Sequence, residues 1–241
     1  MSEIRHVSLE HLAETAAIHW VELAQEAINS RGRFDVALAG GSTPKATYTL
    51  LATPGFFRRV DWTRVFVFWG DERCVPADHP DSNYRMACET WLKHVPIPEE
   101  NIHRLAGEVD PEVGAAEYET MLRGFFAGEA VPRFDLILLG MGADGHAASL
   151  FPGTGGVNER KRWVIGQYVE KLSAWRLTLT PVAINGARNV TFLVSGQAKA
   201  STLQRVVNGP YEPELLPAQV VRPRRGKLLW LVDEAAASQL P

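Results

Sequence analysis

Short runs of mainly hydrophobic residues recur along the chain, each close to a glycine. Runs of this length with little polar alternation are typical of strands in a parallel sheet that is covered on both faces. The pattern predicts strands at Phe34–Ala39, Val65–Trp69, Phe134–Leu139, Val190–Val194 and Leu228–Val232.

The segments between these runs have the composition of helices. Ser8 precedes and Gly32 follows a predicted helix from Leu9 to Ser30, as an N-cap and a helix stop should. Its hydrophobic residues recur at spacings of three and four, at Leu12, Ala16, Trp20, Leu23 and Ala27. Further helices are predicted at Lys45–Leu51, Asn83–Lys93, Pro111–Phe126 and Gln197–Val206.

Strands that alternate with helices predict an α/β protein with a doubly wound, mostly parallel sheet flanked by helices. We find no internal repeat and no low-complexity linker in the 241 residues. Residues 1–241 are therefore expected to form a single domain. Ligands of such folds bind beyond the carboxyl ends of the strands, so the polar runs that follow the strands are the candidate sites.

Composition narrows the classes of partner. The formal net charge of -3 gives no basic field for nucleic acid, and the cluster Arg222–Lys227 is interpreted as a solvated loop. No apolar run is long enough for a membrane span, and the first residues lack the apolar core of a signal peptide. Two cysteines form no disulfide framework. A cytoplasmic protein without nucleic-acid or membrane partners is expected.

The first polar run, AGGSTPK, predicts an anion site. Gly40 and Gly41 let a ligand approach the backbone, and Ser42 or Thr43 is expected to cap a helix with Pro44 in its first turn. The free N–H groups of that helix would face a phosphate. No glycine directly precedes the lysine, so this is not a Walker A loop. A plain turn with a helix cap is the alternative.

The second run, GDER, places two carboxylates and a guanidinium at a strand end. Such charges are costly to bury unless they are paired or functional. Arg73 is a candidate anion ligand, and Asp71 a candidate for orienting hydroxyls or handling protons. Internal ion pairing is the alternative.

The third run, GMGADGH, ends in His146. Its glycines formally match G-x-G-x-x-G, but Pro152 follows too soon for the long helix that a dinucleotide fold needs. An imidazole ordinarily titrates near pH ~6.5 and can act as a base at neutral pH. His146 is therefore the leading catalytic candidate, with Asp144 as the group that orients it or binds substrate. A purely structural histidine is the alternative.

Single cations complete the set of candidates. Arg176 in WRLTLT and Lys199 in SGQAKA are predicted to neutralise a bound anion, although each taken alone is more typical of a surface charge. The other histidines form no close ligand pair, so no metal site is predicted.

Together these runs resemble a known family. The order AGGSTP, WGDERCVP, DSNYRM, LLGMGADGHAASLFPGT, WRLTLTPVAIN, SGQAKA and LLWLVDEAA is similar to that of the 6-phosphogluconolactonases, from about Ala39 to Ala236. The broader superfamily includes glucosamine-6-phosphate deaminases and sugar-phosphate isomerases. HAASLFPGT after DGH, and GDER in place of a tyrosine-ending motif, resemble the lactonase form.

The resemblance implies a Rossmann-like fold and hydrolysis of 6-phospho-D-glucono-1,5-lactone to 6-phosphogluconate, a step of the oxidative pentose phosphate pathway. It implies no cofactor and no metal. His146 matches the proposed general base, and Asp71 and Asp144 match polar residues near the lactone. Substrate or phosphate contacts are implied for Gly40, Gly41, Ser42, Thr43, Arg73, Arg176 and Lys199. The expected partner is a phosphosugar lactone, bound by a monomer or weak homo-oligomer.

The expected mechanism is attack by water. His146 would take a proton from water and return it to the ring oxygen, with an oxyanion held by Arg73 or by N–H groups of Gly140 to Gly145. A covalent mechanism through Ser149 is the rival, although no G-x-S-x-G elbow surrounds it. A deaminase or isomerase on the same scaffold, or a sugar-phosphate sensor without catalysis, remains an alternative function.

Overall fold

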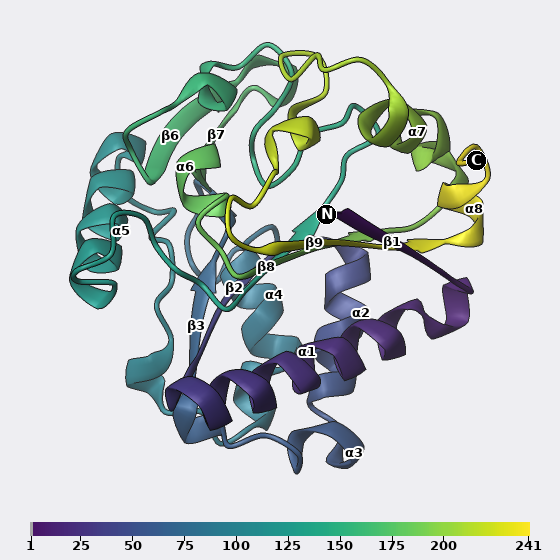
Figure 1. Cartoon of the computed structure of the whole chain (residues 1–241). Coiled ribbons are helices and arrows are strands. Elements are labelled where there is room, and N and C mark those ends of the chain that lie inside the picture. The colour runs from purple at the N-terminus through teal and green to yellow at the C-terminus, as the bar shows by residue number, and fades with distance from the viewer. Residues whose placement is uncertain (1) are drawn as a thin grey trace.

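A six-stranded parallel sheet forms the centre of the molecule, as a computed structural model of residues 2–241 shows (Figure 1). All neighbouring strands of this sheet pair in parallel. The five predicted strands are present and nearly continuous in burial, which is why their sequences lack polar alternation. Across the sheet the order is β1 (Ser2–Val7), β9 (Lys227–Asp233), β8 (Asn189–Val194), β5 (Leu136–Gly140), β2 (Phe34–Leu38) and β3 (Val65–Trp69).

The strand order reverses between β2 and β5. From β2 the chain adds β3 on one side, then returns to place β5, β8 and β9 in succession on the other. Loops that leave two neighbouring strands in opposite directions open a crevice at their carboxyl ends. The loops concerned begin at Ala39 and after Gly140, the two glycine-rich runs singled out in the sequence.

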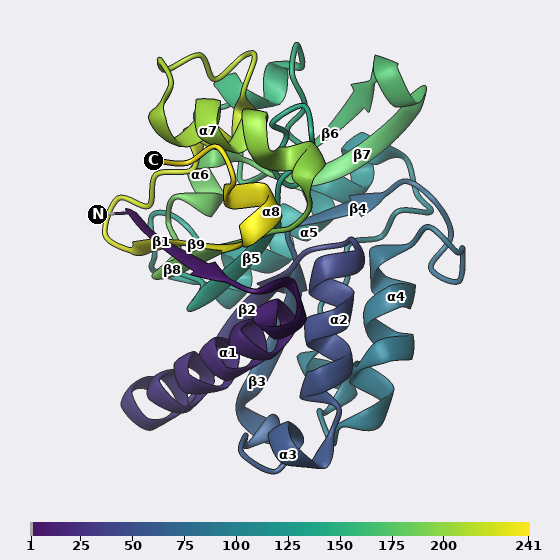
Figure 2. The ribbon, with the colours of Figure 1, turned by 90° about the vertical axis from the view of Figure 1, so that its right-hand side faces the viewer.

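Helices cover both faces of the sheet, which confirms the doubly wound α/β prediction (Figures 1 and 2). One face carries α1 (Leu9–Arg31), α2 (Ser42–Leu51), α3 (Pro54–Phe57) and α4 (Asn83–Thr90). The other carries α5 (Pro111–Phe125), α6 (Pro181–Ile184) and α7 (Ala200–Asn208), and α8 (Glu234–Ala237) lies near the C-terminus. Gly32 ends α1 in the left-handed conformation, with a φ of 78°.

A second, three-stranded antiparallel sheet was not predicted. It contains β4 (Asp71–Arg73), β7 (Ala174–Leu179) and β6 (Val164–Val169), with β7 in the middle. The β6–β7 hairpin projects from the molecule beside the end of the main sheet (Figure 2). Because β4 directly follows β3, this small sheet lies next to the carboxyl ends of the main strands.

Several element boundaries differ from the sequence predictions. The α2 helix begins at Ser42 with Gly41 as its N-cap, so the predicted capping by Ser42 or Thr43 is wrong. The predicted helices at Asn83–Lys93 and Gln197–Val206 each divide into an α-helix and a 3₁₀ turn, at Leu92–His94 and Gln197–Lys199. Ser8 occupies the N-cap position of α1, but its side chain accepts no capping bond from the N–H groups of the first turn.

Two aspartates are buried at the amino ends of β2 and β5. Arg33 Nε lies 3.1 Å from Asp35, and Arg31 Nε lies 2.9 Å from Asp135. Burial outweighs these ion pairs and raises the pKa of Asp35 from 3.8 to about 7. The folded state therefore holds this proton over a pH range in which the unfolded chain has lost it.

We expect the free energy of unfolding to fall as the pH rises through this range, because ionisation of Asp35 is favoured only in the unfolded chain. Asp35→Asn should flatten the dependence of the melting temperature on pH between 3.8 and about 7, the pKa values of Asp35 in the unfolded and folded chain. Asp78→Asn, on the surface, serves as the control. An unchanged slope in Asp35→Asn would contradict the assignment.

Candidate active site

Two adjoining cavities of about 270 Å³ and 320 Å³ lie at the crevice where the strand order reverses. Asp71, Arg73, His146 and Lys199 line both of them. The first is also lined by Gly40, Gly41, Ser42 and Thr43, and the second by Asp144 and Arg176. The structure thus brings every residue proposed for the site to one divided cleft.

A histidine–aspartate pair stands where the two cavities meet. His146 Nδ1 lies 2.6 Å from Asp144 Oδ1. In a neutral imidazole this contact places the proton on Nδ1, which leaves Nε2 with a free lone pair. The ring of His146 also stacks on Phe151, with 4.1 Å between the ring centroids. Two independent contacts therefore fix its orientation.

Glycines make the loop between β5 and the pair tight enough to hold it. The Gly142 N–H donates to the His146 carbonyl at 2.9 Å, and the Gly145 N–H donates to the Gly142 carbonyl at 3.0 Å. Gly145 has a φ of 81°, which favours glycine. The loop closes on itself, and residues 146–151 form no helix. This agrees with the argument against a dinucleotide site.

The carboxylate of Asp144 is shared between two partners. Lys171 Nζ donates to Oδ2 at 2.9 Å, while His146 occupies Oδ1. Burial alone would raise the pKa of Asp144, but the bonds from Lys171 and His146 lower it to about 2. Asp144 is therefore a carboxylate at neutral pH and can stabilise a protonated His146 ring.

Two arginines face each other on the small sheet. Arg73 in β4 pairs directly with Arg176 in β7. Burial, together with the positive charge of Arg73, lowers the pKa of Arg176. Within residues 2–241, neither guanidinium lies in a salt bridge with a carboxylate, although Arg73 donates to the Asp81 carbonyl. Two neighbouring cations that line a cavity and lie in no salt bridge favour an anionic ligand.

Asp71 is held from two sides. Its Oδ2 accepts a bond of 2.8 Å from the Ser149 hydroxyl, and its carbonyl accepts one of 2.9 Å from Asn83 Nδ2. Ser149 is only 1% exposed. Its hydroxyl thus serves as a donor that orients Asp71, which argues against a nucleophilic role.

The N-terminus of α2 reaches the first cavity. Gly41 has a φ of 101°, and the helix of 10 residues starts with Ser42 directly after it. The Thr43 hydroxyl lies 2.9 Å from that of Ser195, which ties α2 to the end of β8. Lys199, in the 3₁₀ turn after β8, also lines this cavity. A helix N-terminus with a nearby ammonium suits a phosphate group.

The sequence predictions did not include Lys171 or Ser195 as site residues, and they considered Ser149 only as the nucleophile of a rival mechanism. Lys171 is 27 positions from Asp144 and lies in an unremarked EKL segment, so no local pattern connects the two. Ser195 could have been found, since it directly follows a predicted strand. Glu72, the other carboxylate of the GDER run, has a structural position. Its burial is compensated by hydrogen bonds that it accepts from the N–H groups of Arg73, Asn83 and Tyr84.

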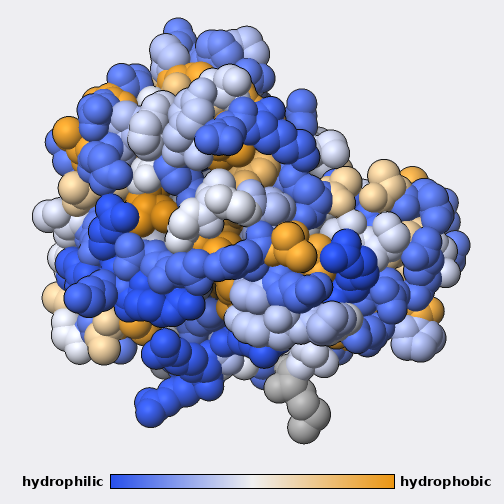
Figure 3. Space-filling view, turned by 90° about the horizontal axis from the view of Figure 1, so that it is seen from above, coloured by the Kyte–Doolittle hydropathy of each residue, from blue (hydrophilic) through white to orange (hydrophobic). Residues whose placement is uncertain are grey.

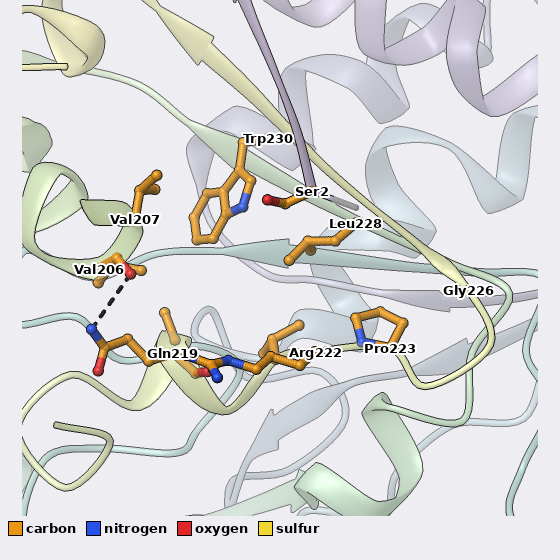
Figure 4. Close-up of a pocket in the computed structure, with 11 residues that line it drawn as sticks. Ser2, Val206, Val207, Gln219, Arg222, Pro223, Gly226, Leu228 and Trp230 are labelled. Carbon is orange, nitrogen blue, oxygen red and sulfur yellow. Dashed lines mark hydrogen bonds between the residues drawn. The ribbon is translucent and has the colours of Figure 1, made fainter. Parts of the chain in front are cut away.

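A further cavity of about 350 Å³ lies beside β9 and α7 (Figure 4). Val206, Leu228 and Trp230 line it together with Arg222, but no carboxylate, histidine or lysine does. The Gln219 amide there is occupied by carbonyls, including that of Val206. This cavity lacks acid–base groups and is not the candidate active site.

The basic cluster is solvated, as predicted. Arg222, Arg224, Arg225 and Lys227 are all exposed. The guanidinium of Arg222 stacks on the ring of Tyr211 at 4.2 Å. Hydrophilic residues cover most of the face that is seen from above, with small apolar patches between them (Figure 3).

The fold and the site define an α/β protein with a histidine–aspartate pair beside a cleft lined by two arginines and a lysine. Residues 8–230 match the family model described as glucosamine-6-phosphate isomerases/6-phosphogluconolactonase. The chain belongs to this family. It is 43% identical to the 6-phosphogluconolactonase of Synechocystis, in an alignment that covers 97% of this chain and 96% of that protein.

Other relatives agree with the resemblance found in the sequence. A probable chloroplastic 6-phosphogluconolactonase of rice is 40% identical, over 96% of this chain and 73% of that protein. The structure of 6-phosphogluconolactonase from Trypanosoma brucei is 30% identical, with a TM-score of 0.89 over 100% of this chain and 99% of that one. A monomeric glucosamine-6-phosphate deaminase shares the fold at 21% identity and a TM-score of 0.82.

The side chains and helices of residues 2–241 also bear on other kinds of site. No group of three or more His, Cys, Asp or Glu side chains is arranged to hold a metal ion there. In the same residues, no helix has both the length and the apolar character that crossing a membrane requires. Independence from metal ions remains a prediction.

Proposed function

We propose that this protein hydrolyses 6-phospho-D-glucono-1,5-lactone to 6-phosphogluconate, the lactonase step of the oxidative pentose phosphate pathway. The names of its relatives support the substrate. The observation that carries the chemistry is the contact of 2.6 Å between His146 and Asp144, in a cleft lined by Arg73, Arg176 and Lys199. A base beside several cations suits hydrolysis of an anionic ester.

His146 acts as the general base. With its Nδ1 proton directed to Asp144, Nε2 takes a proton from a water molecule as the water oxygen attacks C1 of the lactone. The C1–ring oxygen bond then breaks, and the imidazolium returns the proton to the departing oxygen. The Asp144 carboxylate stabilises the imidazolium between these two steps, as in other aspartate–histidine pairs.

Arg73 is the better candidate for stabilising the oxyanion. Sequence reasoning offered the N–H groups of the Gly140 to Gly145 turn as alternatives, but those of Gly142 and Gly145 already donate within the loop. Arg73 lines both cavities and has guanidinium donors beyond the one that bonds to Asp81. A guanidinium close to the developing charge lowers the barrier for acyl transfer.

The substrate phosphate binds at the N-terminus of α2. Ser42 and Thr43 contribute this end of the first cavity, and Lys199 supplies a positive charge. Arg176 lines only the second cavity, so it is better placed for the lactone hydroxyls or carboxylate product than for this phosphate. Anchoring the distant phosphate aligns C1 with the water and His146.

The proposal includes three properties of the protein as a whole. It is a single lactonase domain, a monomer or weak homo-oligomer, and a cytoplasmic enzyme without nucleic-acid or membrane partners. The two cysteines support a reducing compartment, because both Cys74 and Cys88 are free. The rice relative carries the word chloroplastic in its name, so the compartment differs among relatives.

A substrate comparison tests the proposed function. The purified protein is assayed on freshly prepared lactone, with correction for spontaneous hydrolysis, and on glucosamine 6-phosphate, with ammonia release as the readout. We expect lactone hydrolysis that a chelator leaves unchanged, and no ammonia. Ammonia release without lactonase activity would favour the deaminase, and binding of phosphosugars without turnover of either would favour a sensor.

Ser149→Ala tests the rival covalent mechanism. Because the Ser149 hydroxyl only donates to Asp71, we expect kcat to stay within about tenfold of the wild-type value, the range of a lost hydrogen bond. Removing a nucleophilic serine would instead cost roughly 10⁶-fold. Steady-state kinetics on the lactone separate the two outcomes.

A further inference from the structure

Lys171 reaches the catalytic loop from a different part of the fold. It lies in the 3₁₀ turn Glu170–Leu172, which joins β6 to β7 at the tip of the projecting hairpin (Figure 2). Ser173, which directly follows Leu172, ends the turn in the left-handed conformation with a φ of 47°. The turn delivers Nζ to within 2.9 Å of Asp144 Oδ2.

The carboxylate of Asp144 therefore bridges a lysine and the catalytic histidine. One oxygen accepts from Lys171 and the other contacts His146 Nδ1. Lys171 is 69% exposed, so its ion pair with Asp144 contributes little to the stability of the fold. Its main effect falls on the charge balance at His146.

We infer that Lys171 is a positioning residue that sets the pH range in which His146 works as a base. This inference rests on the proposed function. The ammonium compensates the carboxylate of Asp144, and so makes the imidazolium form of His146 less favourable than the carboxylate alone would. Without Lys171, the uncompensated carboxylate holds the proton on His146 up to a higher pH.

The other charged groups around His146 are the same in the wild type and in variants at Lys171. They come from β4, β7 and the 3₁₀ turn after β8, and comprise Asp71, Arg73, Arg176 and Lys199. None of these four is changed by a substitution at Lys171. A difference between variants at that position therefore isolates the contribution of the hairpin lysine.

The test is the pH dependence of kcat/KM for Lys171→Met, Lys171→Arg and wild type. We expect the acidic limb of Lys171→Met to move to higher pH by about half a unit, the size of the effect of one charge that acts across the width of a carboxylate in a water-like medium. Lys171→Arg should restore the wild-type limb. The shift should shrink in about 1 M salt, where exposed charges are screened. Lys161→Met, an exposed lysine outside the cleft, is the matched control.

A measurement without substrate separates this inference from the proposed function. The ring signals of His146 are followed by NMR across the same pH range, and their titration midpoint should move upward in Lys171→Met by the same amount. An unchanged midpoint and an unchanged acidic limb would overturn the role of Lys171. A shifted midpoint in a protein without lactonase activity would keep that role and reject the proposed function.

Discussion

His146→Ala is expected to lower kcat for lactone hydrolysis by about 10²–10⁴-fold, the range that a positioned general base contributes. Of the two side chains in the pair, the His146 ring is the one that can accept the proton of water, at its free nitrogen Nε2. Both oxygens of Asp144 are already engaged by donors. Binding of 6-phosphogluconate should persist, since the proposed phosphate contacts lie at Ser42, Thr43 and Lys199. Initial rates and calorimetric titration with the product measure the two effects separately.

A histidine outside the site provides the control for this substitution. His6 lies on the edge strand β1 with an exposed side chain, so His6→Ala should retain the wild-type kcat. Near wild-type turnover in His146→Ala would remove the base from the mechanism. Loss of both turnover and product binding would indicate that the substitution collapses the cleft, and circular dichroism would then show the structural change.

Gly142→Ala is expected to reduce kcat by about 10²-fold, because even a misplacement of ~1 Å can have this cost in a catalytic site. A Cβ at this position would overlap Nδ1 of His146 and lie 2.5 Å from Asp144 Oδ1. Neither side chain can keep its place, and the contact between them must open. The substitution thus disrupts the pair while leaving both of its chemical groups present.

The control for Gly142→Ala is Gly124→Ala in α5. A Cβ at Gly124 meets nothing within 4 Å, and alanine in a helix is more favourable than glycine. Gly124→Ala should therefore keep full activity and a melting temperature at or above that of wild type. Full activity in a folded Gly142→Ala would contradict the requirement for the pair of Asp144 and His146.

The sequence was informative where burial dictates composition. The five predicted strands all belong to the main sheet, and they are apolar because helices cover both of its faces, so their hydrophobic runs could be read directly. The polar edge strand β1, SEIRHV, was missed because most of its side chains are exposed. The strand β4 was missed because its three residues, DER, are polar and resemble a loop.

Some contacts of the site could likewise be predicted from the sequence, and others could not. Residues in glycine-rich runs at strand ends, such as Gly41 and His146, could be predicted because topology brings strand ends together. The contact between Lys171 and Asp144 could not, because it depends on the path of a hairpin in a sheet that the sequence did not reveal. Pairing of Arg73 with Arg176 was hidden for the same reason, although both were identified as anion ligands.

Chemical rescue of His146→Ala by added imidazole tests the role of His146 most directly. If the ring supplies only a base, free imidazole that enters the vacated space should restore part of the lactonase rate, and the gain should follow the concentration of its neutral form. Gly142→Ala, which keeps its own ring, should not respond. We expect a rescued rate well above the rate that imidazole produces without protein. A rate in His146→Ala no higher than that protein-free blank would rule out His146 as the general base.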